Sequence, residues 1–101
     1  MATTLTRQRT YAVSPEVLFG ACMTALGRMR AHVERQDPVQ GAIVAVVGGS
    51  GPLALASELA LEIAPASAGR TRLTVIWRAR RLGGDRAILP AFLGSVDSLI
   101  G

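Results

Sequence analysis

Residues 51–81 constrain the fold more than any other stretch, because they read as two long strands joined by a short turn. In the first half, large apolar residues fall on every second position, interrupted only by Ser57: Leu53, Leu55, Leu59, Leu61 and Ile63. In the second half, one set of alternate residues is mainly apolar: Leu73, Val75, Trp77 and Ala79. Successive side chains of a strand point to opposite faces, so each half has one apolar face. We therefore predict a hairpin with its turn at 65–69.

A helix over 53–63 is the competing interpretation, because Leu, Ala and Glu are strong helix formers. On a helical wheel, however, the five large apolar residues scatter over most of the circle, whereas on a strand they line up on one face. The strand is therefore the favoured interpretation.

The rest of the chain gives three strands and two helices. Alternation over 4–12, with neither face cleanly apolar, predicts an edge strand. Ser14, Pro15 and Glu16 form a good helix start, and the apolar spacing extends that helix to about residue 29. Residues 31–36 and the buried-strand run 42–47 form a hairpin around turn residues 37–41. An apolar stripe over 89–100 predicts a closing helix, with Pro90 near its start.

The resulting order is β-α-β-β-β-β-α in a single domain, residues 1–101. Adjacent strands between single helices predict an α+β fold: a two-layer sandwich whose antiparallel sheet carries both helices on one face. The chain has one cysteine and therefore no intrachain disulfide. No signal peptide and no membrane-spanning run is visible, so we expect a cytoplasmic protein.

This order resembles two known arrangements. One is the repeat of the TATA-binding protein, and the other is the core of START-like, polyketide-cyclase-like domains, in which a curved sheet grips a C-terminal helix. The segment 11–19 (Tyr-Ala-Val-Ser-Pro-Glu-Val-Leu-Phe) looks like the strand-to-helix transition of START-like proteins, and 35–45 looks like a hairpin of small bacterial domains with this topology. The chain is shorter than a full START-like domain. The resemblance implies the fold, and no catalytic residue is carried over from either family.

Two groups of residues are candidate binding sites. The first is a possible apolar pocket between the sheet and the closing helix, lined by Leu55, Ser57, Leu59, Leu61, Trp77, Phe92 and Val96. Ser57 would be either a polar handle in that pocket or a hydrogen-bonded core hydroxyl.

The second group is a possible contact for an acidic partner: Arg72, Arg78, Arg80 and Arg81. Arg7 and Arg9 would extend this row if the first strand lies nearby. Cross-strand pairing of Glu62 with Arg72, or of Glu58 with Arg78, would neutralise part of it. The arginines beyond Trp77 are expected to exceed the reach of these two glutamates.

Other chemistry-bearing residues favour structural roles. Cys22 falls on the core face of the first helix, and His32, the one histidine, falls on a polar face. A zinc site needs more ligands than these two supply. The Gly48–Pro52 segment lacks the lysine of a phosphate-binding loop and reads as a connector. We expect no metal and no cofactor.

These features favour a non-enzymatic binding module that contacts a protein partner or a second copy of itself through the sheet. An apolar small-molecule or lipid binder with a pocket under the closing helix is the alternative. Nucleic-acid contact through the arginines is a weaker, second alternative: the net charge is +4, all eleven basic residues are arginine, and aromatic residues for base stacking are scarce.

Overall fold

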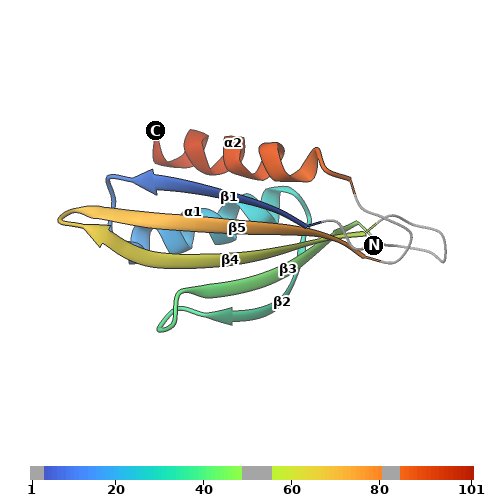
Figure 1. The fold of residues 1–101 in the computed structure, drawn as a ribbon, viewed down its shortest axis with the longest axis horizontal. Coiled ribbons are helices and arrows are strands. Elements are labelled where there is room, and N and C mark those ends of the chain that lie inside the picture. The colour runs from blue at the N-terminus through green and yellow to red at the C-terminus, as the bar shows by residue number, and fades with distance from the viewer. Residues whose placement is uncertain (1–3, 49–55, 81–84) are drawn as a thin grey trace.

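A computed structural model describes residues 4–48, 56–80 and 85–101 of the chain (Figure 1). Five strands and two helices follow one another in the order β1 (Thr4–Tyr11), α1 (Pro15–Arg28), β2 (His32–Asp37), β3 (Ala42–Gly48), β4 (Ala56–Ser67), β5 (Arg70–Arg80) and α2 (Ile88–Ile100). The predicted order of elements is confirmed.

All five strands form one antiparallel sheet in the order β1-β5-β4-β3-β2. The two helices pack together on one face of this sheet, so the predicted two-layer α+β fold is confirmed (Figure 1). β1 is an edge strand, as expected. β3 is paired on both sides, so it has no free edge for self-association.

In the central hairpin, β4 extends further toward the turn than the sequence predicted. Residues 56–63 are strand, as favoured over helix, whereas 53–55 lie outside the described residues. The predicted turn at 65–69 is wrong in extent, because β4 continues to Ser67 and Gly69 completes the turn with φ +71°. β3 pairs with β4 only as far as Glu62, so Pro65 lies where β4 has no partner on that side. A proline, which lacks a backbone N–H, is tolerated at such a position.

Both helices begin where the sequence indicated. The Ser14 hydroxyl caps α1 by accepting from the Val17 backbone N–H at 3.3 Å, and Pro15 is the first helical residue. α2 begins at Ile88, so Pro90 lies in its first turn. A proline there removes no hydrogen bond that the helix would make, and the helix needs no kink.

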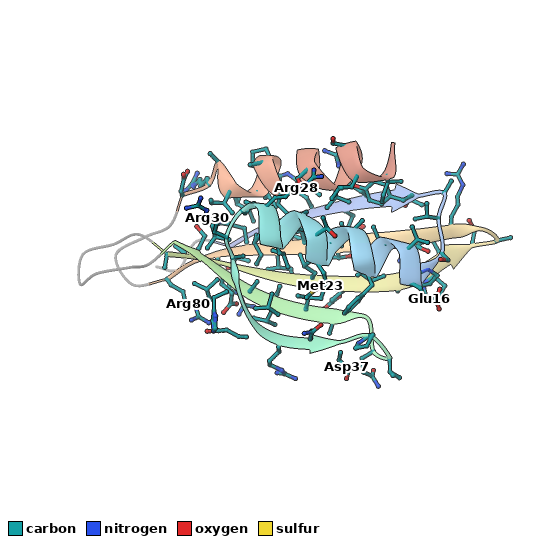
Figure 2. All side chains as sticks on the ribbon, turned by 180° about the vertical axis from the view of Figure 1, so that it is seen from behind. Glu16, Met23, Arg28, Arg30, Asp37 and Arg80 are labelled. Atoms are coloured by element: carbon teal, nitrogen blue, oxygen red, sulfur yellow. The ribbon has the colours of Figure 1, made fainter. Side chains whose placement is uncertain are left out.

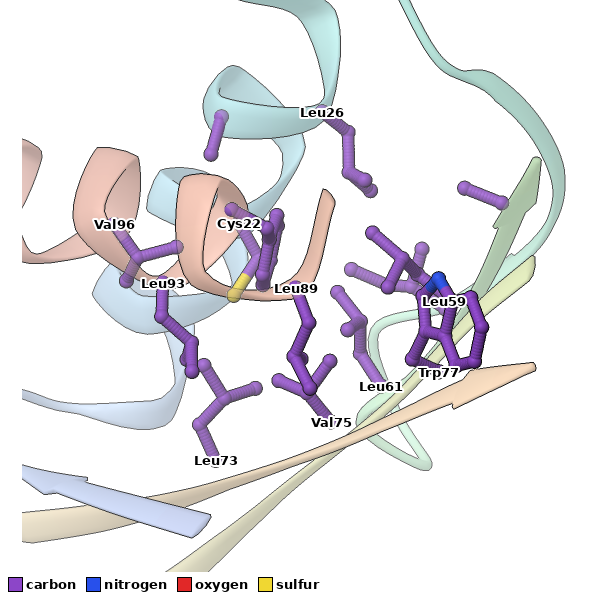
Figure 3. Close-up of a cluster of buried hydrophobic side chains, with 14 of the residues drawn as sticks. Cys22, Leu26, Leu59, Leu61, Leu73, Val75, Trp77, Leu89, Leu93 and Val96 are labelled. Carbon is purple, nitrogen blue, oxygen red and sulfur yellow. The ribbon is translucent and has the colours of Figure 1, made fainter. Parts of the chain in front are cut away.

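The core lies between the sheet and the two helices. Its largest fully buried side chains come from every layer: Trp77, Phe92, Leu18, Leu26, Ile43, Leu59, Leu61, Leu73, Val75 and Val96. Figure 3 shows Leu89, Leu93 and Val96 of α2 facing Leu73, Val75 and Leu61 of the sheet, with Cys22 of α1 beside them. Within the described residues, the predicted apolar faces of both halves of the hairpin are therefore confirmed as packed in or against the core.

Gly41 marks a close approach between the β2–β3 turn and β4. Its φ is +69°, and its carbonyl accepts from the Ile63 N–H at 2.7 Å. A Cβ at this position would collide with the Ile63 carbonyl. Only glycine meets both requirements.

Candidate functional site

A groove of about 400 Å³ runs between the edge strand β1 and the helix α2. Its apolar part comes from both walls: Leu5 of β1 and Leu89, Pro90 and Leu93 of α2. Leu89 and Leu93 also belong to the core, so the groove opens directly onto the packed interior. The volume falls in the range of about 300–1,000 Å³ that is usual for small-molecule sites.

Three arginines line this groove, of which two come from the core-facing side of β1. Arg7 is paired with Val75 and Arg9 with Leu73, and both partners are fully buried core residues. Directly opposed residues share a face of the sheet, so Arg7 and Arg9 point to the helical side. The third, Arg86, comes from the segment just before α2. The groove is therefore both apolar and strongly basic.

One acidic residue, Asp97, lines the groove in the second half of α2. Its carboxylate accepts a hydrogen bond from the Tyr11 hydroxyl at 2.6 Å, which joins the end of β1 to α2. Burial, and then this bond to Asp97, raise the pKa of Tyr11 well above its ordinary value of 10.0. Tyr11 therefore stays protonated and keeps the Asp97 carboxylate engaged.

Trp77 lies against this region and has an unpaired polar atom. It is the cross-strand partner of Leu5, and its side chain is buried at one end of the core cluster (Figure 3). Among the described residues, its indole N–H has no hydrogen-bond acceptor. A buried tryptophan N–H normally has a partner. Trp77 itself is not one of the residues that line the groove.

The residues predicted to line an apolar pocket are brought together, but as solid core. Leu59, Leu61, Trp77, Phe92 and Val96 are each at most 1% exposed. Leu55 lies outside the described residues. The Ser57 hydroxyl donates to the Asp85 carbonyl at 3.3 Å and accepts from the Asp85 N–H at 3.0 Å. Ser57 is thus a hydrogen-bonded core hydroxyl that ties the segment before α2 to β4.

Two of the arginines predicted to contact an acidic partner, Arg78 and Arg80, form ion pairs within the chain. Arg80 binds Glu58 at 2.7 Å and Glu34 at 2.9 Å, and Arg78 lies 3.8 Å from Glu58. The expectation that these two arginines lie beyond the reach of Glu58 and Glu62 is wrong, because Glu58 contacts both of them. Glu34 of β2 supplies a further carboxylate to Arg80. Glu34 falls at the irregularity in the β2–β3 pairing between Val33 and Arg35.

The hydrogen bonds that Arg80 donates to Glu58 and Glu34 also raise the pKa of Arg80. Arg80 lies toward the end of the sheet opposite the Asp37 turn (Figure 2). Arg72 is exposed, and Arg81 lies outside the described residues.

Of the two predicted cross-strand pairs, one forms. Glu58 is opposite Arg78, as expected, whereas Glu62 is opposite Thr74 rather than Arg72. Arg7 and Arg9 do not extend the row of Arg72 and Arg78. Those two are paired with Thr10 and Thr4 on the outer face of the sheet, whereas Arg7 and Arg9 alternate to the helical face.

The remaining predicted residues have structural positions. Cys22 is fully buried and His32 is exposed, as expected. In the described part of the chain, no three His, Cys, Asp or Glu side chains gather as a metal site would require. No helix within that part is long and apolar enough to cross a membrane.

Cys22 gives a direct test of the packing between helix and sheet. Burial raises the pKa of its thiol from 9.0 to about 12. Native protein is therefore expected to react with a thiol reagent only as fast as it unfolds. Between pH 9.0 and about 12, the unfolded thiol has lost its proton and the folded thiol keeps it. The unfolding free energy should therefore fall as pH rises through this range. Denaturant titrations along this range should show a shallower fall for Cys22→Ala, and rapid labelling of native protein would contradict the buried position.

A second hollow, of about 320 Å³, lies between the start of α1 and the β2–β3 turn. Its lining includes Pro15, Phe19, Val39 and Ile63, and its one charged residue is Glu16. It is separate from the groove between β1 and α2 and has no arginine.

No pattern in the sequence indicated that the residues lining the groove would lie together. The sequence did show Leu5, Arg7, Arg9 and Tyr11 on one strand face, and this departure from an apolar core face was the available signal. Their position beside α2 depends on β1 pairing with β5, which no local pattern specifies.

A curved sheet that holds a C-terminal helix is the helix-grip fold, and known structures share it with this chain. The crystal structure of Ara h 8.0201 matches with a TM-score of 0.63 at 12% identity, covering 98% of each chain. That of Mll3558 from Rhizobium loti matches with a TM-score of 0.56 at 22% identity, covering 98% of this chain and 97% of the other.

A larger protein also matches. The di-domain aromatase/cyclase StfQ, from the steffimycin biosynthetic pathway, gives a TM-score of 0.50 at 12% identity, covering 95% of this chain and 42% of StfQ. The sequence itself matches no family model and no curated protein. At these identities the likeness establishes the fold. Of the two resemblances drawn from the sequence, it supports the START-like one.

Proposed function

We propose that this chain is a non-enzymatic binding protein for an apolar small molecule held in the groove between β1 and α2. The groove itself carries the proposal: it is a hollow of about 400 Å³ with apolar side chains on both walls. It lies between the sheet and the C-terminal helix, the two elements that the helix-grip fold sets against each other.

Binding without catalysis is proposed because the groove holds few groups that exchange protons near neutral pH. Its lining contributes Arg7, Arg9, Arg86 and Asp97. Arginine remains protonated in proteins, and the Tyr11 hydroxyl that engages Asp97 also keeps its proton. General acid–base catalysis favours a group whose pKa lies near the working pH.

A small-molecule site is preferred to contact with a protein partner or a second copy through the sheet, the function first expected from the sequence. Glu58 and Glu34 pair with the arginines of β5 on the outer face, which lowers the free charge available to an acidic partner. The groove, in contrast, has a concave shape and arginines without carboxylate partners among the described residues.

A neutral fluorescent probe tests the proposal without involving charge. N-phenyl-1-naphthylamine should bind the wild-type protein with increased emission. Gly94→Phe should weaken that binding about tenfold or more, because Gly94 lines the groove and its missing side chain faces open space. Phenylalanine is a better helix former than glycine, so the variant should fold.

Gly27→Phe is the matched control. Gly27 lies in α1, also faces open space, and does not line the groove. It should bind the probe as wild type does. Equal binding by wild type and Gly94→Phe would exclude the groove, and the absence of any binding would overturn the proposed function.

A further inference from the structure

We infer that the ligand of this groove is a single-chain amphiphile with an anionic head group, held by Arg7, Arg9 and Arg86. This inference rests on the proposed function and specifies its ligand class. It is drawn from where these three arginines lie and from which groups they contact.

The first observation is the position of Arg7 and Arg9. Both occupy core-facing positions of β1, opposite the buried residues Val75 and Leu73. Charged side chains at such positions on an edge strand can act to prevent pairing with another sheet. That role requires nothing from the opposite wall of the groove, yet the opposite wall supplies a third arginine, Arg86.

The second observation is that these charges are not neutralised within the described residues. The ion pairs there involve Arg78 and Arg80, with Glu34 and Glu58, and none of the groove arginines. Arg7 donates to the carbonyl of its neighbour Thr6 at 2.9 Å. The one carboxylate in the lining, Asp97, already accepts from Tyr11 at 2.6 Å. Three arginines and one aspartate leave the groove with a net charge of +2.

The third observation is that the same groove is apolar along both walls. Leu5 faces Leu89, Pro90 and Leu93 across it. The aliphatic stems of arginine extend apolar surface while their heads stay polar. A guanidinium presents a planar fork of donors that matches a carboxylate or phosphate with two hydrogen bonds. An apolar chain with one anionic end is complementary to both features.

Dodecanoate and 1-dodecanol form a matched pair of ligands, because they share a chain and differ in head-group charge. Binding of each is measured by displacement of N-phenyl-1-naphthylamine at low ionic strength and below the concentrations at which they aggregate. Dodecanoate should bind about 10- to 100-fold more tightly than dodecanol, as expected for hydrogen bonds to a charged group. Added salt should reduce the affinity for dodecanoate and leave that for dodecanol unchanged.

Substitutions assign the preference to the groove. Arg7→Gln/Arg9→Gln should remove most of the preference for dodecanoate, with a much smaller change in the affinity for dodecanol. Arg86→Gln should remove part of it from the opposite wall. Arg35→Gln/Arg72→Gln is the control, because it changes the net charge equally at two exposed arginines outside the groove. Circular dichroism and light scattering verify that each variant is folded and monodisperse.

Each failure has its own meaning. Equal affinities of the wild-type protein for dodecanoate and dodecanol would overturn the anionic ligand and leave the proposed function standing. An equal loss in the control pair would also overturn it, because net charge alone would then explain the preference. Unchanged dodecanoate binding with self-association of Arg7→Gln/Arg9→Gln would assign these residues to edge protection instead. Binding of neither ligand would overturn the inference together with the proposed function.

Discussion

Gly41→Ala is expected to lower the free energy of unfolding by about 2–5 kcal/mol. A left-handed conformation costs an L-residue about 1–2 kcal/mol, and forcing a methyl group into packed atoms costs a further ~1–3 kcal/mol. Gly41 combines both, because its φ is +69° and a Cβ there would meet the Ile63 carbonyl. Urea denaturation of the wild-type protein and Gly41→Ala, with the same m-value for both, measures the difference in unfolding free energy.

Gly69→Ala separates the two contributions. Gly69 has nearly the same backbone angle, with φ +71°, but a Cβ there would meet open space. It should therefore lose only the conformational part, about 1–2 kcal/mol. Equal losses at the two glycines would show that β4 does not press on the β2–β3 turn as the structure has it.

Phe92→Ala is expected to cost about 3–5 kcal/mol, the usual range for removing a large aromatic side chain from a core. Phe92 is fully buried on the face of α2 that packs toward α1 and the sheet. Its loss leaves a cavity beneath the helix that forms one wall of the groove. Thermal and urea unfolding both measure the effect.

Two controls accompany this variant. Phe92→Leu keeps much of the buried volume and should lose considerably less stability. Val17→Ala removes an apolar side chain that is 54% exposed, and should change stability by no more than about 0.5 kcal/mol. A loss at Phe92 as small as that at Val17 would contradict the position of α2 against the core.

Much of the fold follows from local patterns in the sequence. The alternation in β4 and β5 identifies their core faces, since Leu59, Leu61, Val75 and Trp77 are all buried. The Ser14-Pro15 pair marks the start of α1 because capping depends on neighbouring residues only. The extension of β4 through Pro65 was missed, because proline is tolerated there only where β3 has ended.

The candidate site depends on contacts between distant segments. A pocket lined by Trp77 and Phe92 was expected between the sheet and the closing helix, but both side chains are buried in the core there. The hollow lies instead at the edge, where arginines replace apolar residues on the inner side of β1. The pairing of Arg80 with Glu34 likewise joins β5 to β2, two strands that β4 and β3 separate in the sheet, a relation that the spacing of residues along the chain does not show.

The pairing of β1 with β5 has a consequence for the order of folding. It joins the beginning of the chain to a late segment, from Thr4 opposite Arg78 to Tyr11 opposite Thr71. The β4–β5 hairpin closes locally, whereas β1 has to wait until β5 has been synthesised, and α2 is made later still. We therefore expect the two walls of the groove to dock last during synthesis, onto a hairpin that has already formed.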